Sequence, residues 1–291
     1  MEFLSPRSWA DALAARSEHP GATPIAGGTD VMVDLNFDRH RPDVLLDLTR
    51  IPELREWSRP EDGGLRLGAG VSYARVMAEL GSVAPGLAMA SRTVGSPQIR
   101  VRGTVGGNLG SASPAGDCHP VLLAVDAVVE VESVRGVRRV PAGEFFLGVK
   151  KSALEPDELI SAVLLPPTSG LEQFAKIGTR NAMVIAVTSF GLALHPQRQA
   201  VGAAIGSAAP TPRHAPSAEQ FLSGALSEAG LWESRAALPE ATATRFGELV
   251  AADASPIDDV RGTSAYRRHA LSVMARRTLG WAWADYQRQA A

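Results

Sequence analysis

The sequence predicts an α+β fold in two domains, with the boundary near Pro166 to Gly170. Before that boundary, short apolar runs alternate with segments of helical periodicity. After it come successive strand-like runs and then helical segments, which is typical of an antiparallel sheet followed by helices. The chain has 291 residues, of which 45% are hydrophobic, enough for two domains with a sizeable core. We therefore expect domains over residues 1–168 and 169–291.

Each element of the first domain has its own local signal. Ser5 and Pro6 mark the start of a helix that extends to about Ser17. Residues 95–116 contain six glycines and two prolines, so we expect no regular element there. Apolar runs and caps predict strands at 24–26, 44–48, 64–70, 129–132 and 158–165, and helices at 73–80, 88–94 and 118–125.

The second domain begins with three predicted strands, at 174–179, 184–194 and 199–207. After Pro210 the pattern becomes helical. Ser264 is the expected cap of a long final helix. Its apolar face should contain Ala270, Val273, Met274 and Trp281.

The charge balance and the cysteine count exclude several classes of protein. The formal net charge is −2, whereas a general nucleic-acid or membrane-surface binder should carry a basic excess. With Cys118 as the single cysteine, the chain can complete neither an internal disulfide nor a cysteine-ligated zinc or iron–sulfur site. No signal peptide or membrane span is evident, and we expect a cytoplasmic protein with no metal site.

The first candidate site is Ala26-Gly27-Gly28-Thr29-Asp30, which follows a predicted strand. Glycines allow a ligand to approach the backbone closely, and free N–H groups at the start of a helix attract phosphate. The alternative is a tight strand-to-helix turn with Thr29 as the helix cap, since caps far outnumber phosphate sites.

The second candidate site is the segment from Gly103 to Asp117, in which four glycines fall within eight residues. Such a segment packs poorly but offers backbone donors that could form a concave nest for an anion. Asp117 could accept a hydrogen bond from a ribose hydroxyl or a ring N–H. The alternative is a long flexible loop, although loops of this length inside compact domains are often functional.

A third candidate is Lys176, which lies on a predicted strand two residues after Phe174. A strand lysine without further context is usually solvated. A basic face on the final helix, formed by residues 266–269 with 276–277, is interpreted as solvated or as a subunit contact, because the overall charge is not basic.

The two glycine segments, about 75 residues apart and in this order, resemble those of the FAD-binding medium subunits of molybdenum hydroxylases. Bacterial xanthine dehydrogenase and carbon monoxide dehydrogenase belong to that family. The resemblance extends over essentially the whole chain. Further similar segments are Gln98–Arg100, Ser113-Pro114, Glu144–Gly148, Glu158–Ile160, Phe174 with Lys176, Pro210–Arg213 and Ser264–Arg267.

The resemblance implies a fold and a cofactor site. The implied fold is a vanillyl-alcohol-oxidase-like FAD-binding domain of two subdomains, about 1–54 and 55–168, followed by a C-terminal domain of antiparallel sheet plus helices. The FAD pyrophosphate would lie across both glycine segments, and no side chain need act as a catalytic acid, base or nucleophile. The implied cofactor-binding residues are Ile25, Ala26, Gly27, Gly28, Thr29, Asp30, Val31, Gly95, Ile99, Gly103, Thr104, Val105, Gly106, Gly107, Asn108, Ser111, Gly116, Asp117, Ile160 and Lys176.

The implied function is that of an oxidoreductase subunit that transfers electrons. FAD would receive electrons from [2Fe-2S] clusters on a small partner subunit, after substrate oxidation at molybdopterin on a large one, and NAD, dioxygen or a quinone would accept them. The implied assembly is a dimer of heterotrimers. Residues 34–39 favour a xanthine-dehydrogenase-like system. The alternatives are a carbon-monoxide-dehydrogenase-like subunit, a stand-alone FAD oxidoreductase, or a binding module without flavin.

Two departures from the family pattern bear on function. Val184 stands where relatives often have an aspartate, so a polar role at that position is in doubt. Relatives that act on hydroxybenzoyl thioesters carry an inserted iron–sulfur cluster, which a chain with one cysteine cannot hold. That branch of the family is therefore disfavoured.

Overall fold

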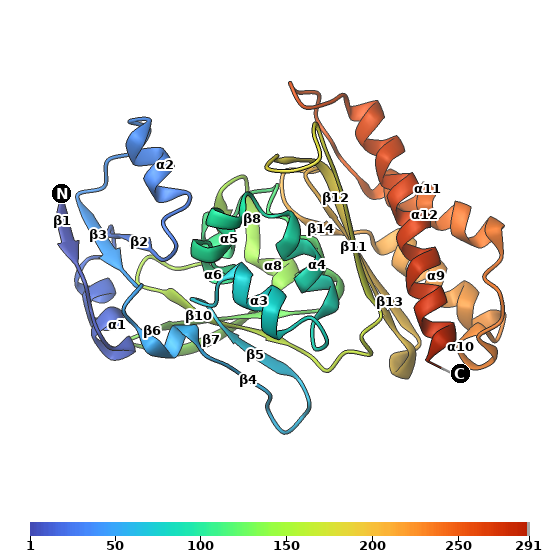
Figure 1. Cartoon of the computed structure of the whole chain (residues 1–291), viewed down its shortest axis with the longest axis horizontal. Helices are drawn as coiled ribbons and strands as arrows, with labels where there is room; N and C mark the ends of the chain where they lie inside the picture. The colour runs from blue at the N-terminus through green and yellow to red at the C-terminus, as the bar shows by residue number, and fades with distance from the viewer. Residues whose placement is uncertain (290–291) are drawn as a thin grey trace.

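The computed structural model describes residues 1–289 and has the α+β fold that the sequence predicts. The chain begins with a small parallel sheet, blue in Figure 1. Its strands lie in the order β1-β3-β2, and their bounds are β1 (Glu2–Leu4), β2 (Thr23–Ile25) and β3 (Val44–Asp47). Parallel neighbours need a crossover connection, and the helices α1 (Trp9–Glu18) and α2 (Val31–Asn36) lie within the two connections.

A five-stranded antiparallel sheet follows, in the order β4-β5-β10-β6-β7. Its strands are β4 (Trp57–Ser58), β5 (Leu65–Gly68), β6 (Val128–Ser133), β7 (Gly136–Pro141) and β10 (Leu159–Leu165). β10 lies at the centre and is almost completely buried, which fits its continuous apolar sequence.

Helices and short strands connect this sheet. The helical elements are η1 (Pro52–Arg55), α3 (Tyr73–Glu79), α4 (Pro85–Thr93), α5 (Pro97–Arg102), α6 (Val105–Ser111), α7 (His119–Ala124) and α8 (Ala142–Phe145). A two-stranded ribbon is formed by β8 (Phe146–Gly148) and β9 (Lys151–Ser152). The apolar side chains of these helices and of the sheet share one hydrophobic core.

The last third of the chain forms a four-stranded antiparallel sheet, in the order β11-β12-β13-β14, and five further helical elements. The strands are β11 (Glu172–Gly178), β12 (Ala186–His195), β13 (Ala200–Gly206) and β14 (Arg213–His214). The helices are η2 (Pro196–Arg198), α9 (Pro216–Glu228), α10 (Leu231–Ser234), α11 (Glu240–Asp253) and α12 (Ser264–Arg288). In Figure 1 the yellow strands stand between the green central helices and the orange and red helices.

The central strand of this sheet, β12, is buried along all ten of its residues, because both faces of the sheet are covered. Phe190 and Leu192 belong to the second hydrophobic core, under α9, α11 and α12. On the other face the glycines admit α7, since a Cβ at Gly202 would lie only 1.9 Å from the carbonyl oxygen of Ala124. This close backbone approach joins the C-terminal sheet to the rest of the molecule.

Several expected elements differ from the structure. Residues 95–116, predicted to be irregular, form α5 and α6, because Ser96 and Thr104 cap these helices with their hydroxyl groups. The first helix is capped by Ser8 rather than Ser5. The strands that were not predicted are β1, β4, β7, β8, β9 and β14.

The final helix also differs from the prediction. Its cap is Thr263 rather than Ser264. Ala270 and Met274 are buried as expected, but Trp281 is 51% exposed, and Arg267 of the predicted basic face is buried. Arg267 donates hydrogen bonds to the carbonyl oxygens of Val187 in β12 and of Ser207 just after β13, so it is not solvated. No helix within residues 1–289 is both long and apolar enough to span a membrane.

Candidate functional site

The first glycine segment connects β2 to α2. Gly28 has φ of +75°, a left-handed conformation that glycine adopts without strain, and this turns the chain into the helix. Asp30, not Thr29, is the N-cap residue, and its side chain makes no capping hydrogen bond. The segment is thus a strand-to-helix turn, as the alternative interpretation expected, but Thr29 is not the cap of the helix.

The backbone amides of this first segment indicate a binding site for an anion. Within the described part of the chain, the N–H groups of residues 26–31 have no hydrogen-bond acceptor. Such a run of unpaired donors around a left-handed glycine has the character of an anion-binding nest. The segment therefore offers the free donors that the sequence suggested.

The second glycine segment has a different local structure. Thr104 caps α6, because its Oγ1 accepts a hydrogen bond of 2.9 Å from the N–H of Gly107. The N–H groups of Val105, Gly106 and Asn108 donate to backbone carbonyls. The expectation that residues 105–108 supply free donors is thus wrong, since each of these amides already has an acceptor.

Instead of free backbone donors, the second segment offers a helix face with almost no side chains. Gly107 and Gly110 are exposed on α6. A Cβ at Gly107 would lie 3.9 Å from the Cβ of Ala26, and a Cβ at Gly110 would lie 3.9 Å from Cδ1 of Ile160. A molecule placed between these residues would rest directly on the backbone of α6.

The two glycine segments touch each other through their backbones. A Cβ at Gly27 would lie 2.0 Å from the carbonyl oxygen of Arg102 and 2.9 Å from Cα of Gly103. Only a residue without a side chain permits this approach. The structure therefore brings the two segments, about 75 residues apart in the sequence, into one site.

Asp117, the last residue of the second glycine segment, forms a buried ion pair with Lys176. Nζ of Lys176 lies 2.6 Å from Oδ2 of Asp117 and 3.2 Å from the carbonyl oxygen of Thr93. The Thr93 hydroxyl also donates to Oδ2 of Asp117, at 2.8 Å. Burial raises the pKa of Asp117, and the neighbouring ammonium partly opposes this shift. The solvated interpretation of Lys176 is wrong, because its side chain is only 8% exposed.

The second oxygen of the Asp117 carboxylate, Oδ1, differs from Oδ2 in its hydrogen bonding. It is buried and has no partner within residues 1–289. A buried carboxylate oxygen without a donor is costly, so this atom needs a hydrogen bond from a bound molecule or from water. Asn108 has a similarly unpartnered buried Oδ1 in the described structure.

Cys118 and His119 pack at the start of α7, within the helix predicted at 118–125. Both are fully buried, and the imidazole of His119 lies 4.6 Å from the ring of Phe146. Burial lowers the pKa of His119 to about 4 and raises that of Cys118 to about 12. The imidazole lies against Gly116, where a Cβ would come within 2.2 Å of the ring.

The remaining predicted site residues are placed as follows. Gly95 adopts φ of +45° against Ile99, and Ser111 donates to the carbonyl oxygen of Asn108. Ile160 is buried on β10 beside α6. Gly110 was part of the second candidate segment but was not singled out as a cofactor contact. Thr93 and Tyr73, whose hydroxyl is buried without a partner in the described structure, were not anticipated and had no sequence signal.

Comparison with known proteins identifies the family that this geometry represents. A family model described as the FAD binding domain in molybdopterin dehydrogenase matches residues 1–168. A second, the CO dehydrogenase flavoprotein C-terminal domain, matches residues 173–282. The chain belongs to the FAD-binding family of molybdopterin dehydrogenases.

Individual relatives narrow this class. The chain is 31% identical over 281 residues to a putative xanthine dehydrogenase FAD-binding subunit of Escherichia coli (strain K12), covering 93% of this chain and 91% of that one. It is 32% identical over 290 residues to the nicotine 6-hydroxylase medium subunit of Paenarthrobacter nicotinovorans, covering 96% of each. It is an FAD-carrying oxidoreductase subunit of the molybdenum hydroxylase type.

Solved structures agree with the assignment of the fold. The chain superposes on a chain of a Cu,Mo-CO dehydrogenase with a TM-score of 0.88 and 25% identity, covering 98% of both. It also superposes on a chain of quinoline 2-oxidoreductase from Pseudomonas putida 86, with a TM-score of 0.88 and 25% identity, covering 99% of this chain and 98% of that one. The predicted FAD-binding fold is confirmed.

Proposed function

We propose that FAD lies across the two glycine segments in the positions that the sequence suggested, with residues 25–31 and 103–108 lining the cofactor. The contact between Gly27 and Arg102 carries this proposal, because it makes one surface of two distant segments. Ser111, Gly116 and Asp117 would lie toward the nucleotide end. Gly95 and Ile99 would flank the cofactor, and Ile160 and Lys176 would lie near it.

The first segment suits the charged part of FAD. A pyrophosphate carries negative charge, and the unpaired N–H groups of residues 26–31 are donors without an acceptor. Such donors offset the charge of a bound anion, and they are held in place by the turn at Gly28. No lysine or arginine side chain is required to offset the charge of the pyrophosphate.

The second segment suits the flat and bulky parts of FAD. The α6 face at Gly107 and Gly110 has no side chain that would hold a ligand away from the backbone. Oδ1 of Asp117 is a buried acceptor without a donor, which fits a hydroxyl or ring N–H. Burial raises the pKa of this carboxyl, and the ion pair with Lys176 partly opposes that shift and orients the group.

The role that we propose for the chain is electron transfer within a larger complex. Bound FAD can accept electrons singly and deliver them as a pair, and the protein binds, orients and tunes it. Substrate would be oxidised on a large molybdopterin subunit, and [2Fe-2S] clusters on a small subunit would supply the electrons. The outgoing acceptor would be NAD, dioxygen or a quinone.

The finer identity is also a proposal. The xanthine dehydrogenase relative favours a xanthine-dehydrogenase-like complex, with a carbon-monoxide-dehydrogenase-like medium subunit as the alternative from the structural relatives. We propose a cytoplasmic dimer of heterotrimers. We also propose a domain boundary at residue 168, with subdomains of about 1–54 and 55–168 and a C-terminal domain of 169–291, supported by the separate sheets on either side of each boundary.

A pair of matched glycine variants tests the cofactor position. Gly110 on α6 and Gly280 on α12 are both exposed helical glycines at which a Cβ meets no atom closer than 3.9 Å. Gly110→Leu should place a side chain in the proposed FAD space and weaken FAD binding at least about tenfold, whereas Gly280→Leu should leave it unchanged. The measurement is a titration of the FAD-free chain followed by flavin fluorescence. Equal binding by both variants would contradict the proposed position.

A further inference from the structure

One strand, β11, contacts both ends of one helix, α4. Glu172 lies at the first turn of α4, and Lys176, four residues further along β11, lies at its last residue. Helix α4 belongs to the FAD-binding domain, whereas β11 is the first strand of the C-terminal sheet. The two contacts therefore join the two domains. We call this pair of contacts the β11–α4 clamp.

At the N-terminal end of the clamp, Glu172 accepts a hydrogen bond. Oε2 lies 2.9 Å from the N–H of Gly86, one of the four amides that a helix leaves without an internal partner. Glu172 is 1% exposed, and a Cβ at Gly86 would lie 2.8 Å from the Cβ of Glu172. A buried, charge-assisted bond in such a tight contact fixes this end of the helix against β11.

At the C-terminal end of the clamp, Lys176 donates to the carbonyl oxygen of Thr93, the last residue of α4. The same ammonium pairs with Asp117, which also accepts from the Thr93 hydroxyl. This end of the helix is therefore tied directly to Asp117, the carboxylate that we propose as an FAD ligand.

The signs of the two charges match the polarity of the helix. A carboxylate stands at its positive N-terminus and an ammonium at its negative C-terminus, so each interaction is favourable. The nine residues of α4 span about 13 Å at ~1.5 Å per residue. Glu172 is thus remote from the cofactor site but connected to it by a short, rigid helix.

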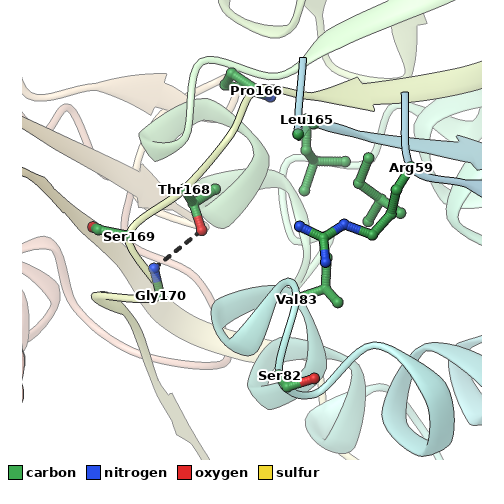
Figure 2. A pocket seen from close by; sticks show the side chains of 11 residues that line it. Arg59, Ser82, Val83, Leu165, Pro166, Thr168, Ser169 and Gly170 are labelled. Carbon is green, nitrogen blue, oxygen red and sulfur yellow. Dashed lines mark hydrogen bonds between the residues drawn. The ribbon is translucent and has the colours of Figure 1, made fainter. Parts of the chain in front are cut away.

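The linker before β11 adds little support at the N-terminal end of α4. A cavity of about 220 Å³ separates Thr168, Ser169 and Gly170 of the linker from Ser82 and Val83, which precede α4 (Figure 2). The hydrogen bond drawn there, from the N–H of Gly170 to the Thr168 hydroxyl, is internal to the linker. Glu172 therefore supplies the hydrogen bond that ties the N-terminal end of α4 to β11.

From this arrangement we infer that the β11–α4 clamp couples FAD binding to the docking of the C-terminal domain, with Glu172 as a positioning residue that never touches the cofactor. Releasing Gly86 would let α4 shift and would move Thr93 away from Lys176 and Asp117. By linkage, FAD held by Asp117 would tighten the contact between the domains to the same extent. This inference rests on the proposed function, because it takes Asp117 as an FAD ligand.

The test compares Glu172→Ala, Glu172→Gln and a control, Gln173→Ala, in the full chain. Gln173 is the next residue of β11 but bonds to Asp285 of α12, so it lies outside the clamp. We expect Glu172→Ala to weaken FAD binding about 5- to 10-fold, in the lower range of couplings between sites. Glu172→Gln should restore most of the affinity, since its amide oxygen can still accept from Gly86, and Gln173→Ala should bind as wild type.

A double variant and hydrogen exchange separate this coupling from a general loss of structure. With Lys176→Met, the effect of Glu172→Ala on FAD affinity should fall below twofold, because the path is already broken. Without FAD, the amides of residues 86–93 should exchange at least about tenfold faster in Glu172→Ala, while those of α9 remain unchanged. Three results would each overturn the inference. The first is faster amide exchange in Glu172→Ala with unaltered FAD affinity, and the second is unaltered amide exchange. The third is that the effects of Glu172→Ala and Lys176→Met on FAD affinity are fully additive. A wild-type chain that binds no FAD would instead refute the proposed function.

Discussion

The contact between the two glycine segments makes Gly27→Ala the sharpest test of the site. The added Cβ would lie 2.0 Å from the carbonyl oxygen of Arg102, whereas real Cβ contacts essentially never fall below 3.0 Å. The segments must therefore separate by at least about 1 Å. Forcing a methyl group into a packed site costs about 1–3 kcal/mol. If that cost falls on the FAD-bound state, binding weakens about 5- to 150-fold at ~1.4 kcal/mol per factor of ten.

The assay is a titration of the FAD-free chain followed by flavin fluorescence, with unfolding temperatures measured in parallel. Gly21→Ala is the control, because Gly21 is exposed and a Cβ there meets no atom within 4 Å. That variant should bind FAD as wild type does. A folded Gly27→Ala chain with unchanged FAD affinity would refute the reasoning that the two segments act as one surface.

Four further predictions concern buried charged and polar groups. Lys176→Met should shift the flavin midpoint potential in a redox titration, because it removes a buried positive charge beside the site; an unchanged potential would argue against tuning by Lys176. Cys118, with its pKa raised to about 12, should resist thiol reagents at neutral pH until the chain unfolds; rapid labelling of the native chain would show otherwise. The pKa of His119 is about 4 in the folded chain and 6.5 in the unfolded chain. As the pH falls, the unfolded chain therefore binds the proton first. The free energy of unfolding should therefore drop by about 3 kcal/mol from pH 6.5 to 4, and His119→Leu should remove this part of the pH dependence in denaturant titrations. Arg267→Met should cost about 2–4 kcal/mol of stability, because it removes the buried donor to the carbonyl oxygens of Val187 and Ser207; a loss below 0.5 kcal/mol would contradict that account.

Much of the fold was predictable because local signals were strong. β12 was expected from its long apolar run, and it is the central buried strand of its sheet. The helix before Leu80 was expected from Ser72, whose hydroxyl does cap it. Where caps and glycines compete, the sequence was misleading: Ser96 and Thr104 start helices in a segment whose glycine content argued against them. Local propensity gave way there to capping and packing.

The candidate site could be predicted only in part, for a physical reason. A series of glycines can be read directly from the sequence, so both segments were found. Which amides remain free depends on tertiary hydrogen bonds, such as that from Gly106 to Ala69, and these have no sequence signal. The same holds for Lys176 with Thr93 and for Glu172 with Gly86, which lie 83 and 86 residues apart.

The central claim is that this chain is the flavin-carrying electron-transfer subunit of a molybdenum hydroxylase. The most direct measurement is the visible absorption of the flavin in the purified chain, alone and with its large and small partner subunits, before and after addition of the reducing substrate of the complex. We predict about one FAD per chain in both samples, with flavin bleaching by substrate only when the partners are present. A colourless complex, or flavin bleached by a small substrate without any partner, would contradict the account.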